Sequence, residues 1–175
     1  MSKFKLLLLD ANVVIHLFKL GLWDTIVERC DVHLSAVVIG EAGFWEDENE
    51  MPHSIDLNPY IDSGAVTKFE VPLEQIMAFC ADFSKTYKGD LDDGEAESLT
   101  YLLGSTDEYA ICSADHIVFQ VLGSHYRSSQ GISLEEVLQA VGLSRQLPYW
   151  FTKAYREKLT RSGFADGLQG RSSPD

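Results

Sequence analysis

Short apolar runs alternate along the chain with segments in which apolar residues recur about every three to four positions. The runs are typical of strands buried in a parallel sheet, and the wider spacing is typical of helices that cover such a sheet. The predicted strands are Lys5–Leu9, Asp31–Leu34, Ala65–Val71 and Glu108–Cys112. The predicted helices cover residues 12–19, 21–29, 35–45, 72–87, 94–103, 115–122, 133–141 and 148–161. The alternation predicts an α/β fold with a doubly wound, mostly parallel sheet and a binding site at the carboxyl ends of its strands.

Residues with strong local preferences mark several element ends. Gly21 separates the first two helices, Ser35 is a suitable N-cap, and Pro72 suits the first turn of the helix that it begins. The stretch Glu46–Pro59 is polar, acidic and contains two prolines, so we predict a loop or a lid there.

The length of 175 residues, with 45% of them apolar, is enough for one hydrophobic core. We expect a single domain over residues 1–162, in which 145–162 form a C-terminal helix able to bind a partner, and a disordered tail over 163–175. No apolar run approaches the roughly 20 residues that span a bilayer. The three cysteines are widely spaced, which is typical of reduced thiols in a cytoplasmic protein.

The chain is strongly acidic, with a formal net charge of −13 at pH 7. Residues 145–175 contain six basic and three acidic residues, so the acidic excess lies entirely within residues 1–144. Because phosphate contacts need Lys and Arg, this composition argues against nucleic-acid binding by bulk electrostatics. The basic C-terminal segment is either a separate binding surface or a solvated helix.

Asp10 directly follows the first predicted strand, so its carboxylate is expected at the carboxyl edge of the sheet. An aspartate before a helix is also a common N-cap, and both interpretations are open. Asn12, on the following helix, either orients this carboxylate as a supporting polar group or is a turn residue.

Glu41 lies on a predicted helical face that is otherwise apolar and is expected to meet the sheet. The other members of that face are Val37, Val38, Ala42 and Trp45. A glutamate on such a face is costly unless it is paired or binds a cation. No basic residue occurs between Arg29 and Lys68, so the sequence favours a metal ion as the partner of Glu41.

Glu95 shares a predicted helical face with three leucines and is expected to point inward, whereas Glu97 is expected on the opposite, solvated side. Asp92 and Glu95 also have the spacing of a capping box, which needs no metal. Asp92 and Asp93 are alternative ligands if the helix begins earlier than predicted.

Asp115 follows the last predicted strand, where it is a helix cap or a fourth ligand, and Ser113 is a supporting polar group that positions it or binds a metal-linked water. With Asp10, Glu41 and Glu95 it forms a group of acids at one sheet edge. Like charges this close raise one another's pKa unless cations bridge them. Oxygen ligands without His or Cys suit Mg²⁺ or Mn²⁺, which can activate water and neutralise a phosphodiester.

The order of these acids resembles that of the PIN-domain nucleases. The matching motifs are Leu9–Ile15 (LDANVVI), Ser35–Glu41 (SAVVIGE), Asp93–Glu97 (DGEAE) and Ser113–Asp115 (SAD). The resemblance implies a three-layer Rossmann-like fold and Mg²⁺- or Mn²⁺-dependent endoribonuclease activity on RNA that leaves 5′-phosphate ends. It also implies that the chain could be a homodimeric toxin of a toxin–antitoxin pair, regulated by an antitoxin protein.

Carried over by position, the resemblance makes Asp10 the central metal ligand, and Glu41, Glu95 and Asp115 complete a catalytic cluster. The acidic stretch Glu46–Glu50 departs from this scheme because it would repel RNA close to the site.

The segment Pro148–Arg161 interleaves aromatic with basic residues. Such a pattern can stack bases and hold phosphates, but aromatic residues at helical spacing more commonly pack against the domain. Both interpretations are open from the sequence.

Two functions of other classes compete with the nuclease. A phosphatase could use Asp10 as its nucleophile, although Asn12 stands where that chemistry usually has a second acid. A degenerate PIN-like fold could serve only as a binding module, in which case the acids would hold no metal.

Overall fold

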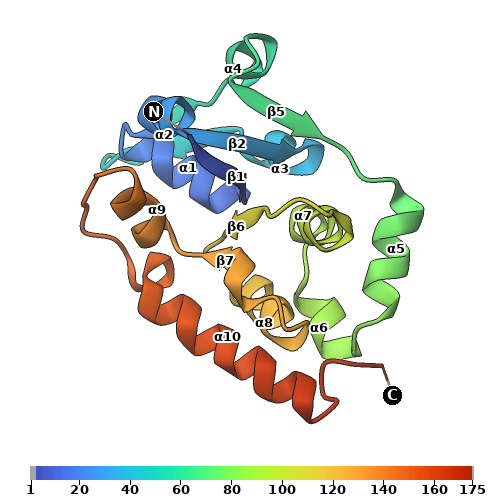
Figure 1. Cartoon of the computed structure of the whole chain (residues 1–175). Coiled ribbons are helices and arrows are strands. Elements are labelled where there is room, and N and C mark those ends of the chain that lie inside the picture. Colours follow the sequence, from blue (N-terminus) through green and yellow to red (C-terminus); the bar gives the residue numbers. More distant parts are fainter. Residues whose placement is uncertain (1–2, 175) are drawn as a thin grey trace.

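Five parallel strands form the centre of the computed structural model, which describes residues 3–174 (Figure 1). The strands are β1 (Phe4–Leu9), β2 (Cys30–Ser35), β5 (Val66–Phe69), β6 (Ala110–Cys112) and β7 (Gly131–Ile132). The main helices are α1 (Ala11–Lys19), α2 (Trp23–Arg29), α3 (Ala36–Glu41), α4 (Asn58–Asp62), α5 (Leu73–Ala81), α6 (Lys85–Asp90), α7 (Asp93–Gly104), α8 (His116–Ser124), α9 (Leu134–Ala140) and α10 (Lys153–Leu168). The predicted α/β class is confirmed.

The strand order is β5-β2-β1-β6-β7, with β1 in the middle. The chain runs outward from β1 through β2 to β5 and then crosses back to β6, on the other side of β1. The strand order therefore reverses between β1 and β6. In a doubly wound sheet such a reversal leaves a crevice at the carboxyl ends of the two strands, where ligands bind.

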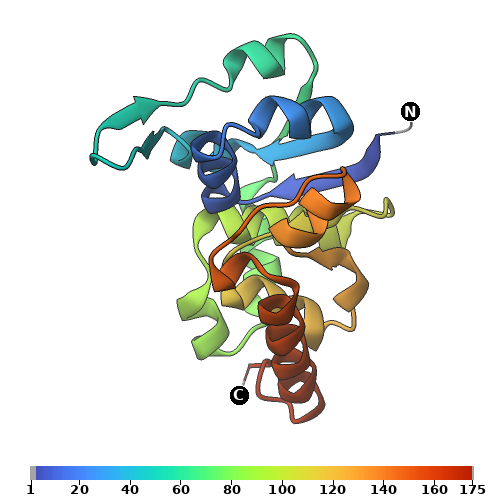
Figure 2. The ribbon, with the colours of Figure 1, turned by 90° about the vertical axis from the view of Figure 1, so that its left-hand side faces the viewer.

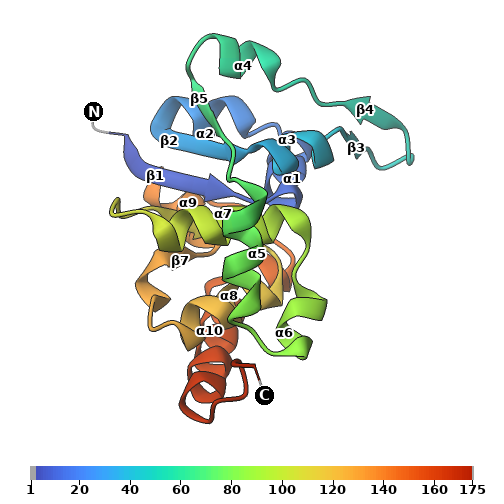
Figure 3. The same cartoon turned by 90° about the vertical axis from the view of Figure 1, so that its right-hand side faces the viewer.

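Helices cover both faces of the sheet, which makes a three-layer Rossmann-like fold. The side chains of adjacent residues in β1 point to opposite faces of the sheet, because side chains alternate along a strand. Leu9 belongs to one core with the apolar faces of α1, α2 and α9, whereas Leu8 belongs to a second core with those of α7 and α8. Figures 1 and 3 show these two groups of helices on either side of the strands.

The region between β2 and β5 differs from its prediction. The helix predicted over 35–45 ends at Glu41, and the chain then forms an antiparallel hairpin of β3 (Phe44–Glu46) and β4 (Pro52–Ser54). Gly40 and Gly43 flank the helix end and weaken any continuation of the helix. The predicted loop or lid over 46–59 therefore contains β4, and the hairpin projects from the body of the molecule (Figure 2).

Two further elements differ from those that the hydrophobic pattern predicts. The helix predicted over 72–87 is divided into α5 and α6, because the side chain of Ser84 caps α6 by accepting a hydrogen bond from the Tyr87 amide. The short strand β7 was not predicted, since two residues carry no periodic signal.

The predicted disorder from Gly163 is also wrong. Helix α10 continues to Leu168 and packs along α8. A Cβ atom on Gly163 would lie 1.9 Å from the carbonyl oxygen of Gln120, and one on Gly123 would lie 2.1 Å from that of Thr160. These glycines therefore permit close approach of two helix backbones. Beyond the helix, the carbonyl of Ser172 accepts a 2.8 Å hydrogen bond from the Ser84 amide.

No helix among residues 3–174 combines the length and the apolar character that crossing a membrane requires.

Replacing Gly163 by alanine should lower the free energy of unfolding by about 3 kcal/mol, because the added methyl group overlaps backbone atoms of α8. Urea denaturation measures the change. Gly104→Ala is the matched control, since a Cβ there meets no atom within 4 Å, and it should change stability by less than about 0.5 kcal/mol. Equal effects of the two substitutions would contradict the close packing of α8 and α10.

Candidate functional site

The carboxylate of Asp10 is buried where the sheet order reverses. Its Oδ1 accepts a 2.8 Å hydrogen bond from the Val13 amide, so Asp10 is the N-cap of α1. Its Oδ2 accepts hydrogen bonds from the Ser113 hydroxyl and, at 3.0 Å, from the Ala114 amide, both beyond the end of β6. Both sequence interpretations of Asp10 thus hold in part: it caps a helix and lies at the sheet edge.

Burial raises the pKa of Asp10 to about 6, although the bonds from Ser113, Val13 and Ala114 act in the opposite direction. The charge of Asp115 adds to the increase in the pKa. Asp10 is therefore held in a fixed orientation in surroundings that disfavour its own negative charge.

Glu95 is buried in the first turn of α7, as predicted. Its Oε2 accepts a 3.1 Å hydrogen bond from the Asp92 amide, and its own amide donates at 2.7 Å to Oδ1 of Asp92. The predicted capping box is thus present. Burial raises the pKa of Glu95 to about 9, with further contributions from the charges of Asp115, Asp92 and Asp10.

Glu41 is the last residue of α3, and its side chain is exposed rather than buried against the sheet. The sequence-based prediction of its burial is therefore wrong, because α3 ends there and leaves the side chain at the rim. The carboxylate lies close to α7, since a Cβ on Gly94 would be 2.9 Å from its Oε2. Partial desolvation and the charges of Asp92, Asp93 and Asp10 raise the pKa of Glu41.

These acids surround one small pocket of about 230 Å³, which we call the acidic pocket. Its polar lining comes from Asp10, Asn12, Glu41, Asp92 and Glu95. The remaining lining residues are Ala11, Ile15, Val38 and Gly94. Three of the four predicted ligands and the alternative ligand Asp92 therefore meet in one pocket beside the carboxyl end of β1.

Asp115 and Asp93 lie outside the lining of the acidic pocket. Asp115 caps α8 by accepting from the Ile117 amide and also lies 2.9 Å from Nδ1 of His116. Its charge still raises the pKa of both Asp10 and Glu95. Ser113 donates to Asp10 and accepts a 2.9 Å bond from the Asp115 amide, so it connects the two acids.

The donor set of the acidic pocket suits a hard divalent cation. Among the described residues, no Lys or Arg forms an ion pair with Asp10, Glu41 or Glu95, and the charge of Asp10 contributes to the raised pKa of the other two. In the same part of the chain, no three His, Cys, Asp or Glu side chains converge on one point closely enough to hold an ion together. The pocket therefore has the charge and the oxygen donors that a hard divalent cation takes, but its described side chains do not form a converged set of ligands.

Glu97 has a structural position that the sequence did not reveal. It was predicted to be solvated, but its side chain is only 3% exposed. One oxygen accepts a 2.9 Å hydrogen bond from the Val71 amide beyond β5, and the other accepts a 3.3 Å bond from the Val37 amide in α3. Glu97 thereby ties α7 to the carboxyl ends of two strands.

The aromatic and basic segment Pro148–Arg161 divides between its two interpretations. Phe151 is buried and packs against His16 with ring centroids 4.5 Å apart and the rings tilted by 31°. Arg156 donates two hydrogen bonds of 2.7 and 2.8 Å to Glu136. Trp150, by contrast, lies on the surface. Part of the segment therefore packs against the domain, and part remains free to contact a ligand.

In comparisons with known proteins, no family model matches this chain, and no curated protein or solved structure is similar to it.

The stability of the protein should fall as the pH rises from about 5 to 9 in the absence of divalent cations. The pKa of Glu95 is raised from 4.5 to about 9, so across this window the folded chain binds a proton that the unfolded chain releases. Unfolding thus becomes more favourable with increasing pH. Glu95→Gln, which carries no charge and keeps an acceptor for the Asp92 amide, should flatten the dependence in urea denaturation. An unchanged slope would contradict the raised pKa, and Glu48→Gln on the exposed hairpin turn is the control.

Removing the carboxylate in Glu97→Ala should lower the free energy of unfolding by about 2 kcal/mol or more, because two backbone amides lose their acceptors. Glu97→Gln keeps one carbonyl acceptor and should cost less. Hydrogen exchange should also be faster at the Val37 and Val71 amides of both variants. Exchange at wild-type rates would show that Glu97 does not hold these strand ends.

Proposed function

We propose that this chain is a metal-dependent endoribonuclease of the PIN-domain type, which hydrolyses phosphodiester bonds of RNA at the acidic pocket. The observation that carries the proposal is that Asp10, Glu41 and Glu95, from three separate parts of the chain, line one pocket beside the carboxyl end of β1. Asp115 lies close enough to raise the pKa of two of them.

Hydrogen bonds account for part of this arrangement, because Asp10 accepts from three donors and Glu95 accepts from the Asp92 amide. Other buried or half-buried acids of the protein are matched to donors: Glu97 accepts from two amides, and Glu136 pairs with Arg156. In the acidic pocket, burial is the largest cause of the raised pKa of Asp10, Glu41 and Glu95, and the charge of Asp10 adds to the increase at Glu41 and Glu95. A negative charge in such surroundings is favoured by a bound cation, and its loss is favoured by protonation.

Asp10, Glu41, Glu95 and Asp115 would hold Mg²⁺ or Mn²⁺, with Asp92 as an alternative to Glu95. The bound ion supplies charge neutralisation for the phosphodiester and activation of the attacking water. Ser113 and the Ala114 amide fix the orientation of Asp10. The exposed amide of Asn12 can donate a hydrogen bond to a phosphate oxygen in the pocket.

The proposal extends to a biological role. A net charge of −13 disfavours tight binding of RNA by the free protein, and it favours a basic protein partner. A toxin kept in check by a basic antitoxin, acting as a homodimer in the cytoplasm, agrees with this charge. The free cysteines Cys30, Cys80 and Cys112 agree with a reducing compartment.

Glu41→Gln should fold normally, because the side chain is exposed, but should lose Mn²⁺-dependent cleavage of single-stranded RNA. We expect a loss larger than the ~10–100-fold that follows removal of a residue that only supports a metal ligand. Cleavage is measured with a labelled oligoribonucleotide, and thermal unfolding checks the fold. Glu48→Gln should cleave at the wild-type rate. Unchanged cleavage by Glu41→Gln would exclude the proposed site.

Calorimetry with Mn²⁺ separates the nuclease from a binding module. The nuclease requires binding that is weakened in Asp10→Asn and in Glu95→Gln. A wild-type protein that binds no Mn²⁺ would instead favour the binding module, which agrees with the lack of a converged ligand group among the described side chains.

A further inference from the structure

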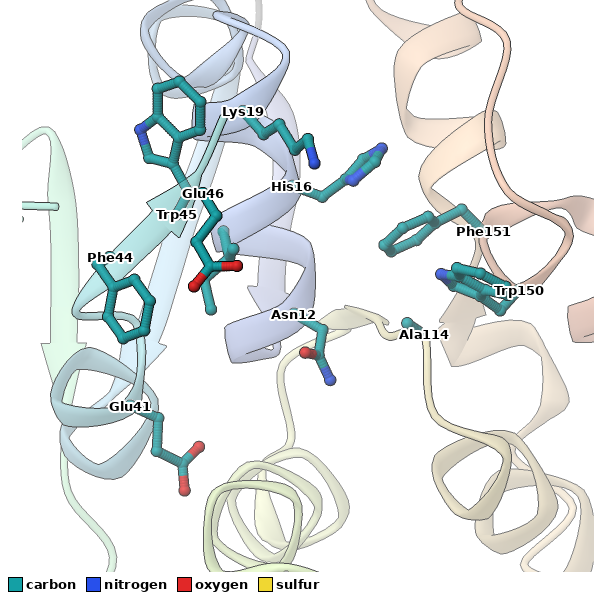
Figure 4. A pocket seen from close by; sticks show the side chains of 11 residues that line it. Asn12, His16, Lys19, Glu41, Phe44, Trp45, Glu46, Ala114, Trp150 and Phe151 are labelled. Atoms are coloured by element: carbon teal, nitrogen blue, oxygen red, sulfur yellow. The ribbon is translucent and has the colours of Figure 1, made fainter. Parts of the chain in front are cut away.

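A second, larger cleft of about 640 Å³ adjoins the acidic pocket. The two share Asn12, Ile15 and Glu41 in their linings, so a ligand can extend from one into the other. We call it the hairpin–η2 cleft, because its walls come from the β3–β4 hairpin and from the 3₁₀ helix η2 (Tyr149–Phe151). Helix α1 lies between these walls (Figure 4).

The two walls present aromatic side chains to solvent. Trp150 points from η2 into the cleft, and Phe44 lies on the opposite wall (Figure 4). Trp150 is 51% exposed, and Phe44 is also exposed. Large apolar side chains that line a surface cleft without a partner mark a binding site more often than isolated exposed ones do.

The backbone that carries Trp150 is held in place by the neighbouring residue. Phe151 is buried and packs against the His16 ring of α1, and its amide donates a 3.0 Å hydrogen bond to the carbonyl of Pro148. These contacts hold η2 against α1. Because the backbone at Trp150 is positioned without a ligand, the entropic cost of stacking a base on the indole is lower.

Polar groups of both signs complete the cleft. Lys19 lines it and forms no ion pair with any described side chain, so its ammonium group is available to a phosphate. The carboxylate of Glu46 can accept a hydrogen bond from an exocyclic amino group. An aromatic platform, one cation and one acceptor together match the chemistry of a single nucleotide.

We propose that the hairpin–η2 cleft holds an unpaired nucleobase of single-stranded RNA, stacked on Trp150, next to the phosphate that enters the acidic pocket. The inference rests on the proposed function, because the shared lining places this base beside the bond to be cleaved. It also explains how an acidic protein holds RNA: stacking supplies affinity that phosphate contacts cannot. A paired base is excluded from such a platform, so single strands are selected.

The test compares two hexanucleotides by fluorescence anisotropy: oligoadenylate, and an abasic ribose-phosphate chain of the same charge. Trp150→Ala should weaken binding of oligoadenylate by about 5- to 150-fold, the effect expected of one lost stacking contact, and should leave binding of the abasic chain unchanged. Trp150→Phe should restore most of the affinity. The matched control is Tyr149→Ala, because Tyr149 belongs to the same 3₁₀ helix and is 53% exposed but lies outside the cleft lining.

The outcomes distinguish this inference from the proposed function. If Trp150→Ala binds oligoadenylate with wild-type affinity, the nucleobase site is overturned, and a protein partner becomes the favoured occupant of the cleft. An equal loss of affinity for oligoadenylate and for the abasic chain in Trp150→Ala would also overturn the nucleobase site. So would a loss of affinity for oligoadenylate in Tyr149→Ala as large as that in Trp150→Ala. Mn²⁺ binding, measured by calorimetry, should be the same in Trp150→Ala and in the wild type. Base-dependent binding without any Mn²⁺-dependent cleavage would support the nucleobase site and reject the nuclease.

Discussion

The hydrogen-bonded carboxylate of Asp10 is the interaction on which the site geometry depends. Its two oxygens connect the end of β1 to the first turn of α1 and to the chain beyond β6. Burial disfavours the charge, and the three donors offset this effect only in part, so the pKa remains raised to about 6. The same bonds hold the chain segments that follow β1 and β6 together at the point where the strand order reverses.

The protein uses its carboxylates in two ways. Glu97 and Glu136 are matched to donors, and each joins parts of the chain that are distant in sequence. Glu41 and Glu95 face other acids, and their pKa values are raised. Like charges this close destabilise the folded chain unless protons or a cation offset them, and their accumulation in one pocket supports the proposed cation site.

The packing of helix α10 helps to position η2, which forms one wall of the hairpin–η2 cleft. Gly123 and Gly163 let the backbones of α8 and α10 approach closely, which sets the position of α10 against α8. The chain that leads into α10 carries η2, and Phe151 anchors η2 against α1. Trp150 thereby comes to lie opposite β3, more than a hundred residues away in sequence.

The sequence by itself determined the alternation of strands and helices, the position of Asp10 at a strand end and the Asp92–Glu95 capping box, because these follow from local periodicity and short-range hydrogen bonds. The tertiary structure decided the rest. The acceptor role of Glu97 depends on amides 26 and 60 residues away, which no local pattern encodes. The sequence predicts a flexible segment at Gly163, whereas the structure shows close packing of this residue against α8. Because glycine lacks a side chain, it permits both backbone flexibility and close backbone contact, and the sequence alone does not distinguish the two.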